Sequence, residues 1–273
     1  MSSASKSGAR DGHHIEHSLT SLPDLTIALM QLISRRLRRR TSAAGADPLI
    51  TYYDLGSGER TELSAVTVSN WVEKTCYLLT DEYGLDLGDI VLLDVARTHP
   101  GHWVTACLEL ACWRIGATVA VDGGHDADGG ADARLVVAGP DYGAVVARAA
   151  ELGADVLACS LHPLGLPFTE RLPAGVTDYS LDVRAQPDQY AAMPVPTDAP
   201  AWRSAEVALT QAELDNVAGS ADRRLIRPTT PWPTVRDGIL AALIGGGSLV
   251  VVVGEDDAAL ARIRTTENVR AEV

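Results

Sequence analysis

Lysine is almost absent from the sequence. Of the 23 positively charged side chains, only Lys6 and Lys74 are lysines, and all the others are arginines. A mechanism that requires a catalytic or phosphate-binding lysine therefore has only two candidate residues. The sequence also lacks the G-x-S-x-G motif of hydrolase nucleophiles and the Walker motif. Hydrolase and P-loop activities consequently have no support in the sequence.

Cysteine is scarce as well. None of the four cysteines belongs to a C-x-x-C pair, so we predict free thiols in a reducing compartment rather than a disulfide framework. The expected role of each is a buried structural thiol, and the four are Cys76, Cys107, Cys112 and Cys159. Residues 1–22 lack the apolar core of a secretory signal. We therefore expect no export and predict a cytoplasmic protein.

Basic residues are outnumbered by acidic ones. The chain has 36 acidic and 23 basic side chains, which gives a net charge of −13, and this balance argues against nucleic-acid binding through phosphate neutralisation. The exception is an arginine run between Arg35 and Arg40, which we expect at the C-terminus of a helix that begins near Asp24. There the helix dipole stabilises cations, and the acidic body of the protein can pair with them. Contact with an anionic membrane is the alternative, but the acidic remainder of the chain opposes it.

No apolar run is long enough to cross a membrane. Between Gly238 and Gly254 no residue is charged, but as a helix this stretch would extend only roughly 25 Å, less than the ~30 Å hydrocarbon core. The glycines at 245–247 would also break it. We predict a helix, a glycine stop and a buried strand there, and no transmembrane segment.

The remaining composition is that of a folded protein. Hydrophobic residues make up 46% of the 273 residues, enough for a sizeable core. Residues 1–22 contain little to bury, so we expect a disordered tail there and a folded part over residues 23–273. Within the folded part we expect a first α/β half over about 23–159, an irregular connection over 160–205, and a second α/β part over 206–273.

Short apolar runs alternate with amphipathic helical patterns along most of the chain. This alternation predicts an α/β fold with mostly parallel sheets flanked by helices. The expected strands, including a hairpin around Gly56 and Gly58, lie at 50–53, 59–62, 90–93, 117–121, 134–138, 154–158, 176–179, 206–209, 224–226 and 248–253. The expected helices lie at 24–40, at 64–79 with Ser64 as N-cap, at 102–115 before Gly116, at 142–152, from Thr210, at 234–244 and near the end of the chain.

Two stretches of this pattern resemble a known family. The first runs from Thr61 to Val121 and contains the turn G-L-D-L-G-D at 84–89 and the helix end C-W-R-I-G-A at 112–117. The second runs from Leu209 to Val252 and contains the helix Q-A-E-L-D-N at 211–216 and a proline-rich segment at 228–233. Their order and spacing resemble the N-terminal region of the adenylate-forming superfamily, which includes acyl-CoA synthetases, amino-acid adenylation domains and luciferases. The sequence looks most similar to a set of actinobacterial proteins that resemble truncated N-terminal pieces of these enzymes.

The resemblance implies an ATP-phosphate loop that the sequence does not supply. In the family this loop is rich in serine, threonine and glycine and ends in a lysine, because small residues let backbone N–H groups surround the phosphates. The corresponding stretch, which we place at 196–204, has neither glycine nor lysine but contains Trp202 and Asp198. Lys6 lies in the expected tail and Lys74 within an early helix, so neither is expected to replace that lysine, and the family's later motifs have no counterpart. We therefore predict no catalytic residues, no nucleotide cofactor and no adenylating activity.

Other polar groups offer weaker candidates for a site. His13, His14 and His17 are expected in a solvated tail, and the segment with His125, Asp126 and Asp128 in a flexible acidic loop, so no metal site is predicted. A possible ligand or partner surface is the remaining prediction. Two of its residues, His99 and His102, lie at a strand-to-helix junction. The other three, Trp202, Arg203 and Trp232, lie near the position that the resemblance gives to the family's active site.

Two functions remain open at this point. The first is a non-catalytic binding or interaction module that associates with itself or with a protein partner, with exposed apolar area near 228–233 and 239–244 as its expected mark. The alternative is a residual acyl-CoA synthetase or ligase that uses a non-standard or partner-supplied nucleotide site. The identity of a small-molecule ligand does not follow from the sequence.

Overall fold

The fold is known from a computed structural model that describes residues 32–121 and 132–273. The predicted tail, the predicted helix start at Asp24 and the histidines at 13, 14 and 17 lie outside these residues. The same is true of His125, Asp126 and Asp128.

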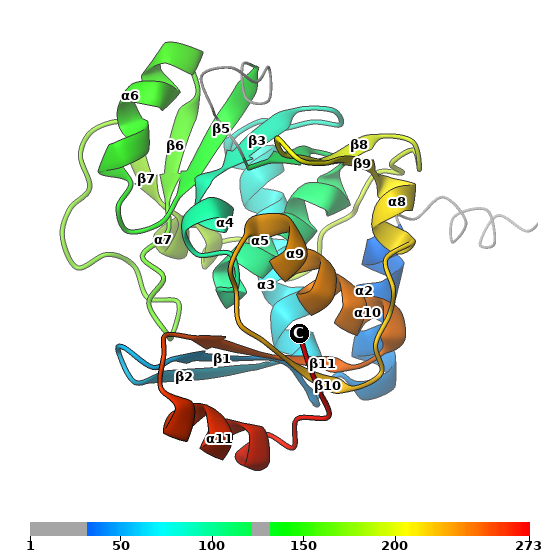
Figure 1. Ribbon diagram of the computed structural model, residues 1–273. Helices are drawn as coiled ribbons and strands as arrows, with labels where there is room; N and C mark the ends of the chain where they lie inside the picture. Colours follow the sequence, from blue (N-terminus) through cyan, green and yellow to red (C-terminus); the bar gives the residue numbers. More distant parts are fainter. Residues whose placement is uncertain (1–31, 122–131) are drawn as a thin grey trace, which may run out of the picture.

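Two sheets form the framework of the molecule (Figure 1). The smaller sheet contains five strands, in the spatial order β12 (Ala271–Glu272), β10 (Arg223–Ile226), β11 (Ser248–Val253), β1 (Pro48–Asp54) and β2 (Glu59–Ser64). The larger sheet contains seven, in the order β7 (Val176–Asp178), β6 (Asp155–Ala158), β5 (Ala133–Ala138), β3 (Ile90–Leu93), β4 (Thr118–Ala120), β8 (Pro200–Arg203) and β9 (Ala208–Thr210). Only β1–β2 and β8–β9 pair antiparallel, so the prediction of mostly parallel sheets is confirmed.

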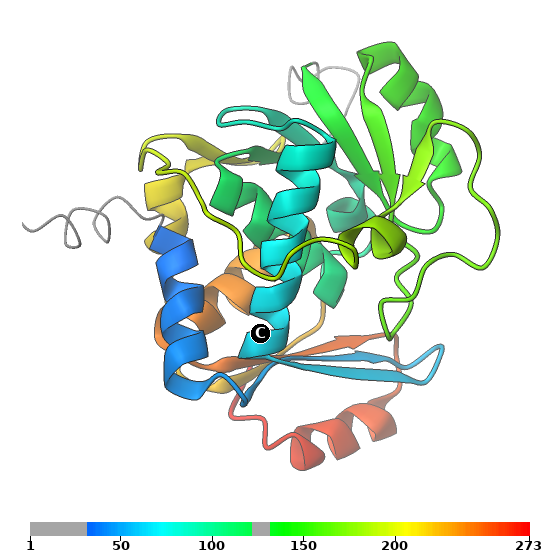
Figure 2. The ribbon, with the colours of Figure 1, turned by 180° about the vertical axis from the view of Figure 1, so that it is seen from behind.

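Helices fill the space between the sheets and cover their outer faces. Figures 1 and 2 show α3 and α5 between the two sheets, α11 on the far face of the smaller sheet and α6 on the far face of the larger one. The helices are α2 (Leu32–Ala44), α3 (Ala65–Tyr77), α4 (Asp94–Thr98), α5 (Trp103–Ile115), α6 (Gly143–Leu152), α7 (Tyr179–Val183), α8 (Gln211–Asp215), α9 (Pro231–Val235), α10 (Ala241–Gly245) and α11 (Asp257–Thr266). Two π-helical turns, Leu78–Glu82 and Arg236–Leu240, extend α3 and join α9 to α10.

Local sequence signals explain the central helices. Ser64 caps α3 by accepting a hydrogen bond from Thr67 N, and Gly116 ends α5 in the left-handed region at φ 83°, as predicted for both helices. All thirteen residues of α5 are buried. This helix is therefore the centre of the core, and its N-terminus is fixed between the two sheets.

The outer face of the smaller sheet is held by a polar cluster around Glu267, the C-cap residue of α11. Its carboxylate accepts hydrogen bonds from Tyr53 Oη, from Arg60 at 2.9 Å and from Arg223. The donors lie on β1, β2 and β10, so one carboxylate joins α11 to three strands. Burial raises the pKa of Glu267, but the hydrogen bonds from Tyr53, Arg223 and Arg60 outweigh burial and hold it below the ordinary value.

Three local predictions are wrong. The arginine run does not end its helix, because α2 continues to Ala44 and no basic residue lies in its last turn. The predicted irregular stretch contains two ordered pieces beside β7, the helix α7 and the strand β8. The expected exposed apolar area is largely absent, since Ile239 and Leu243 are only 2% and 3% exposed, while Ile244 and, within 228–233, Trp232 are half-buried. These side chains pack into the central core.

Two other predictions agree with the structure. All four cysteines are free and buried. Within the described ranges, none of the helices is long and apolar enough to cross a membrane.

Candidate ligand or partner surface

A tight hairpin occupies the position where the resemblance places the phosphate loop. Residues 200–203 of that stretch form strand β8, and the connection to β9 is the turn 204–207. The turn is closed on itself, because Ser204 N donates to Val207 O at 2.9 Å and Val207 N donates to Ser204 Oγ at 3.2 Å. A four-residue turn of this kind has no ring of free N–H groups with which to surround phosphates.

The short helix α8 follows the hairpin, and its first N–H groups are already engaged. Gln211 N donates to Ala199 O at 3.0 Å, and Ala212 N donates to Thr197 O at 2.8 Å. In a helix these amides are the groups that would bind an anion. Here the preceding segment, folded back over the helix start, occupies them.

A capping box completes the closure of α8. Glu213 N donates to Thr210 Oγ1 at 3.4 Å, and the Glu213 carboxylate accepts from Thr210 N at 2.8 Å. The hydrogen bond from Thr210 N, followed by that from its hydroxyl, holds the pKa of Glu213 below the ordinary value. An anionic ligand approaching this helix would therefore meet a carboxylate and no free amide.

Beside the hairpin lies a hollow of about 370 Å³. We call it the hairpin groove, and it is lined on the larger sheet by Ile90, Thr118, Trp202, Arg203 and Leu209, among others. It brings together two of the five predicted surface residues, Trp202 and Arg203. Most of its named walls are apolar, which suits the apolar part of a ligand or partner better than a triphosphate.

The two tryptophans pack against each other, Trp202 being buried and Trp232 half-buried. Trp202 is 1% exposed, and its ring lies 5.5 Å from that of the half-buried Trp232. Trp202 belongs to the central core and also lines the hairpin groove, so only a small part of its side chain is open to a ligand or partner. The first residues of α9 hold Trp232 against it.

His102 acts as a structural residue of α5. It is the N-cap, its Nδ1 accepts from Val104 N at 3.1 Å, and its ring packs edge-on against Tyr52 at 4.8 Å. Only 3% of the residue is exposed, and burial lowers its pKa to about 3. The imidazole is therefore neutral and closed to solvent at physiological pH.

His99 lies nearby but is only half-buried. Its Nδ1 is 3.0 Å from Thr98 Oγ1, and Gly139 lies so close that a Cβ there would stand 3.1 Å from the same nitrogen. Burial lowers its pKa, against the attraction of Asp141 and Asp94. The ring contacts of the described residues connect His102 with Tyr52 and Trp103, and none connects the histidines with the tryptophan pair.

One buried charged residue was missed at the sequence level. Glu109 lies in the middle of α5 with 2% exposure, and burial raises its pKa well above the ordinary value. Burial therefore favours the uncharged form of this carboxyl group. The signal was available, since Glu109 is the only charged side chain in the first eleven residues of an apolar helix.

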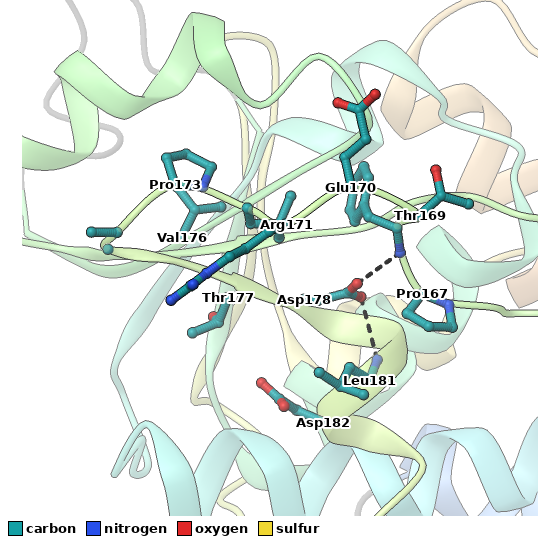
Figure 3. A pocket seen from close by; sticks show the side chains of 14 residues that line it. Pro167, Thr169, Glu170, Arg171, Pro173, Val176, Thr177, Asp178, Leu181 and Asp182 are labelled. Atoms are coloured by element: carbon teal, nitrogen blue, oxygen red, sulfur yellow. Dashed lines mark hydrogen bonds between the residues drawn. The ribbon is translucent and has the colours of Figure 1, made fainter.

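A larger hollow, of about 680 Å³, is formed by the single segment 167–182 (Figure 3). One of its carboxylates, that of Asp178, already receives hydrogen bonds from Phe168 N at 2.8 Å, Ser180 N at 2.9 Å and Leu181 N. Two of these are dashed in Figure 3. This hollow is thus explained by the way that the segment caps α7 and folds around it.

Comparison with known proteins identifies the chain. No protein-family model matches the sequence. A curated protein of Mycobacterium tuberculosis (strain ATCC 25618 / H37Rv), named TIGR03089 family protein, is 41% identical over 228 residues, which cover 81% of this chain and 89% of that protein. The chain belongs to the TIGR03089 family.

Solved structures confirm the fold that the resemblance predicted for this TIGR03089 family member. An acyl-CoA synthetase from Brucella canis superposes with a TM-score of 0.71 at 16% identity, over 91% of this chain and 49% of the synthetase. A benzoate CoA ligase from Burkholderia xenovorans LB400 gives 0.64 at 14% identity, over 86% and 48%. The N-terminal domain of FACL13 from Mycobacterium tuberculosis gives 0.61 at 16% identity, over 88% and 62%. The TIGR03089 chain therefore has the adenylate-forming fold and spans about half the length of the first two enzymes.

Proposed function

We propose that this TIGR03089 family protein is a non-catalytic binding or interaction module built on the adenylate-forming fold. One observation carries the proposal: the first amides of α8 donate to Ala199 O and Thr197 O, and the hairpin before them closes in the turn 204–207. These are the elements in which the resemblance would require a phosphate loop. With these amides occupied, they are not available to hold the phosphates of a nucleotide.

The lysine distribution supports the same proposal. Lys74 lies on α3, where its Nζ pairs with Asp188 at 3.0 Å. This lysine thus ties the segment before β8 to the central helices. Lys6 is the other lysine of the chain, and it lies outside the described residues.

The hairpin groove is the recognition surface that this proposal assigns. It combines half-buried apolar side chains, Ile90 and Leu209, with the guanidinium-bearing Arg203 on one edge. Such a surface would take a small apolar group or an apolar side chain of a partner.

Pyrophosphate exchange is the decisive test. The purified full chain is incubated with Mg-ATP, labelled pyrophosphate and a panel of fatty and aromatic acids, with an intact acyl-CoA synthetase as positive control. We expect no exchange above the level without protein for any acid. Acid-dependent exchange would overturn the proposal and favour a residual ligase.

A thermal-shift screen locates the recognition surface. Fatty acids, CoA and aromatic acids are tested against the chain and against Leu209→Glu, which places a charge in the hairpin groove. Leu87→Glu, at a 52% exposed leucine outside the groove, is the matched control. A stabilising compound should lose its effect in Leu209→Glu only, and equal loss in both variants would contradict the assignment.

A further inference from the structure

A second hollow lies on another side of the molecule, between α2 and α10. The two helices lie side by side in Figures 1 and 2, next to the smaller sheet. The hollow has a volume of about 330 Å³, and three arginines of α2 line it, Arg36, Arg39 and Arg40. Asp47 and the apolar Ile244 form part of the opposite wall. We call it the arginine hollow.

Arg36 already has a counter-charge. Its Nε and one terminal nitrogen donate to the two carboxylate oxygens of Asp215 at 2.9 and 3.0 Å. This two-pronged ion pair ties α2 to α8 and neutralises the guanidinium. Arg36 therefore shapes the hollow but leaves little positive charge in it.

Arg40 is buried without a carboxylate. The residue is 8% exposed, and its terminal nitrogens donate to the carbonyl oxygens of Ala44 and Pro48. Its Nε has no hydrogen-bond partner, and in residues 32–121 and 132–273 no carboxylate forms an ion pair with it. A guanidinium cannot lose its proton at physiological pH. A buried charge of this kind is costly unless an anion compensates it.

Arg39 adds a second positive charge to the same space. It is exposed, it lines the arginine hollow, and among the described residues its side chain has neither a hydrogen bond nor an ion pair. Asp47 opposes this charge but forms no ion pair with Arg39 or Arg40. Two guanidiniums against one carboxylate leave the hollow short of negative charge.

We propose that the arginine hollow binds a phosphate group, either free or carried by a small molecule. A phosphate has about −1.5 to −2 charges at pH 7 and three strong acceptor oxygens, so it can compensate Arg40 and engage Arg39 at once. The volume is at the lower end of the range for small-molecule pockets. The inference goes beyond the proposed function, because the arginine hollow shares no residue with the hairpin groove.

The test is a calorimetric titration of the full chain with inorganic phosphate at constant ionic strength. We expect saturable binding that Arg39→Gln weakens at least about tenfold, since one charge-assisted hydrogen bond contributes that much. Arg38→Gln removes the same charge from an exposed arginine that does not line the hollow. This control variant should change the affinity less than about twofold.

Three outcomes would overturn the proposal. They are the absence of saturable binding, an equal loss of affinity in Arg39→Gln and Arg38→Gln, and binding of acetate as tight as that of phosphate. Sedimentation with phosphatidic acid vesicles distinguishes a lipid headgroup from a free phosphate. If the protein binds inorganic phosphate and also binds the vesicles in a way that depends on Arg39, the ligand is a lipid headgroup. Vesicle binding without binding of inorganic phosphate belongs to the first of these three outcomes and contradicts the site. Neither readout depends on pyrophosphate exchange, so the two proposals can fail separately.

Discussion

Two buried charged groups, Glu267 and Arg40, are treated differently by the same fold. The Glu267 side chain is 6% exposed and receives hydrogen bonds from Tyr53, Arg60 and Arg223. Arg40 is comparably buried at 8%, but it is matched only by neutral carbonyl oxygens. The buried charge of Glu267 is compensated by its donors and joins parts of the fold. The buried charge of Arg40 lacks an anionic partner among the described residues, which is the basis of the proposed phosphate site.

The largest effect on stability is expected from removing the carboxylate of Glu267. Glu267→Ala removes the hydrogen bonds that the carboxylate accepts from Tyr53, Arg60 and Arg223, and with them the polar connection between the end of α11 and three strands. We expect a loss of about 3 kcal/mol in the free energy of unfolding, measured by urea denaturation at pH 7. Glu272→Ala is the matched control, because Glu272 pairs with Arg264 at 39% side-chain exposure and should cost less than about 1 kcal/mol. Equal costs would contradict the special role of Glu267.

The pH dependence of the same carboxylate has a defined sign. Its pKa in the folded state is lowered, so its stabilising contribution is present above the unfolded pKa of about 4.3 and is lost as the pH falls through the folded value. The difference in stability between the wild type and Glu267→Ala should therefore shrink below about pH 4.

His102 sharpens the comparison, because an imidazole can avoid a buried charge by losing its proton. Its pKa falls from 6.5 to about 3 on folding, so between these values the unfolded chain binds the extra proton. Stability contributed by this group is present above about pH 6.5 and falls by up to about 1.4 kcal/mol for each pH unit below it.

The variant His102→Asn tests this dependence, since asparagine keeps an N-cap acceptor but does not titrate. We expect its stability to fall less steeply than that of the wild type between pH 6 and pH 4, followed by thermal unfolding. His162→Asn, at an exposed histidine, should keep the wild-type slope. A slope unchanged in His102→Asn would show that other groups control the acid response.

The smallest effect on stability is expected from removing the guanidinium of Arg40. Arg40→Met removes a charge that has no carboxylate partner among the described residues and replaces it with an apolar chain of similar length. In phosphate-free buffer the free energy of unfolding should change by less than about 1 kcal/mol, because lost hydrogen bonds offset the relieved desolvation. Added phosphate should stabilise the wild type more than the variant. Arg36→Met, which leaves Asp215 unpaired, should cost more, about 1–2 kcal/mol, and the reverse order would contradict the comparison.

Local signals allowed much of the fold to be predicted from the sequence. The N-cap at Ser64, the terminator Gly116 and the glycines of the β1–β2 turn each act within a few residues. The end of α2 differs from the prediction because the helix continues past the arginine run to Ala44 and stops at Gly45. A Cβ at Gly45 would stand 2.5 Å from Thr41 O.

The candidate site was less predictable, because contacts between distant residues decide it. Trp202 is buried partly by packing on Trp232. The first amides of α8 donate to the carbonyl oxygens of Thr197 and Ala199, and no local sequence pattern predicts that this segment folds back over the helix. The burial of Arg40 likewise depends on α10, which follows two hundred residues later in the chain. None of these contacts has a signature in the residues immediately around it.

The pairing of β1 with β11 has a consequence for synthesis of the protein. Ile50 lies beside Leu249 in a parallel pair, although most of the chain separates them. On the ribosome β1 and its hairpin partner emerge early, but the middle of the smaller sheet stays empty until translation has nearly reached the last helix. Contacts of such long range form slowly, and an apolar strand edge that waits for its neighbour is prone to aggregation. The nascent chain should therefore need a chaperone at this edge for longer than at the larger sheet.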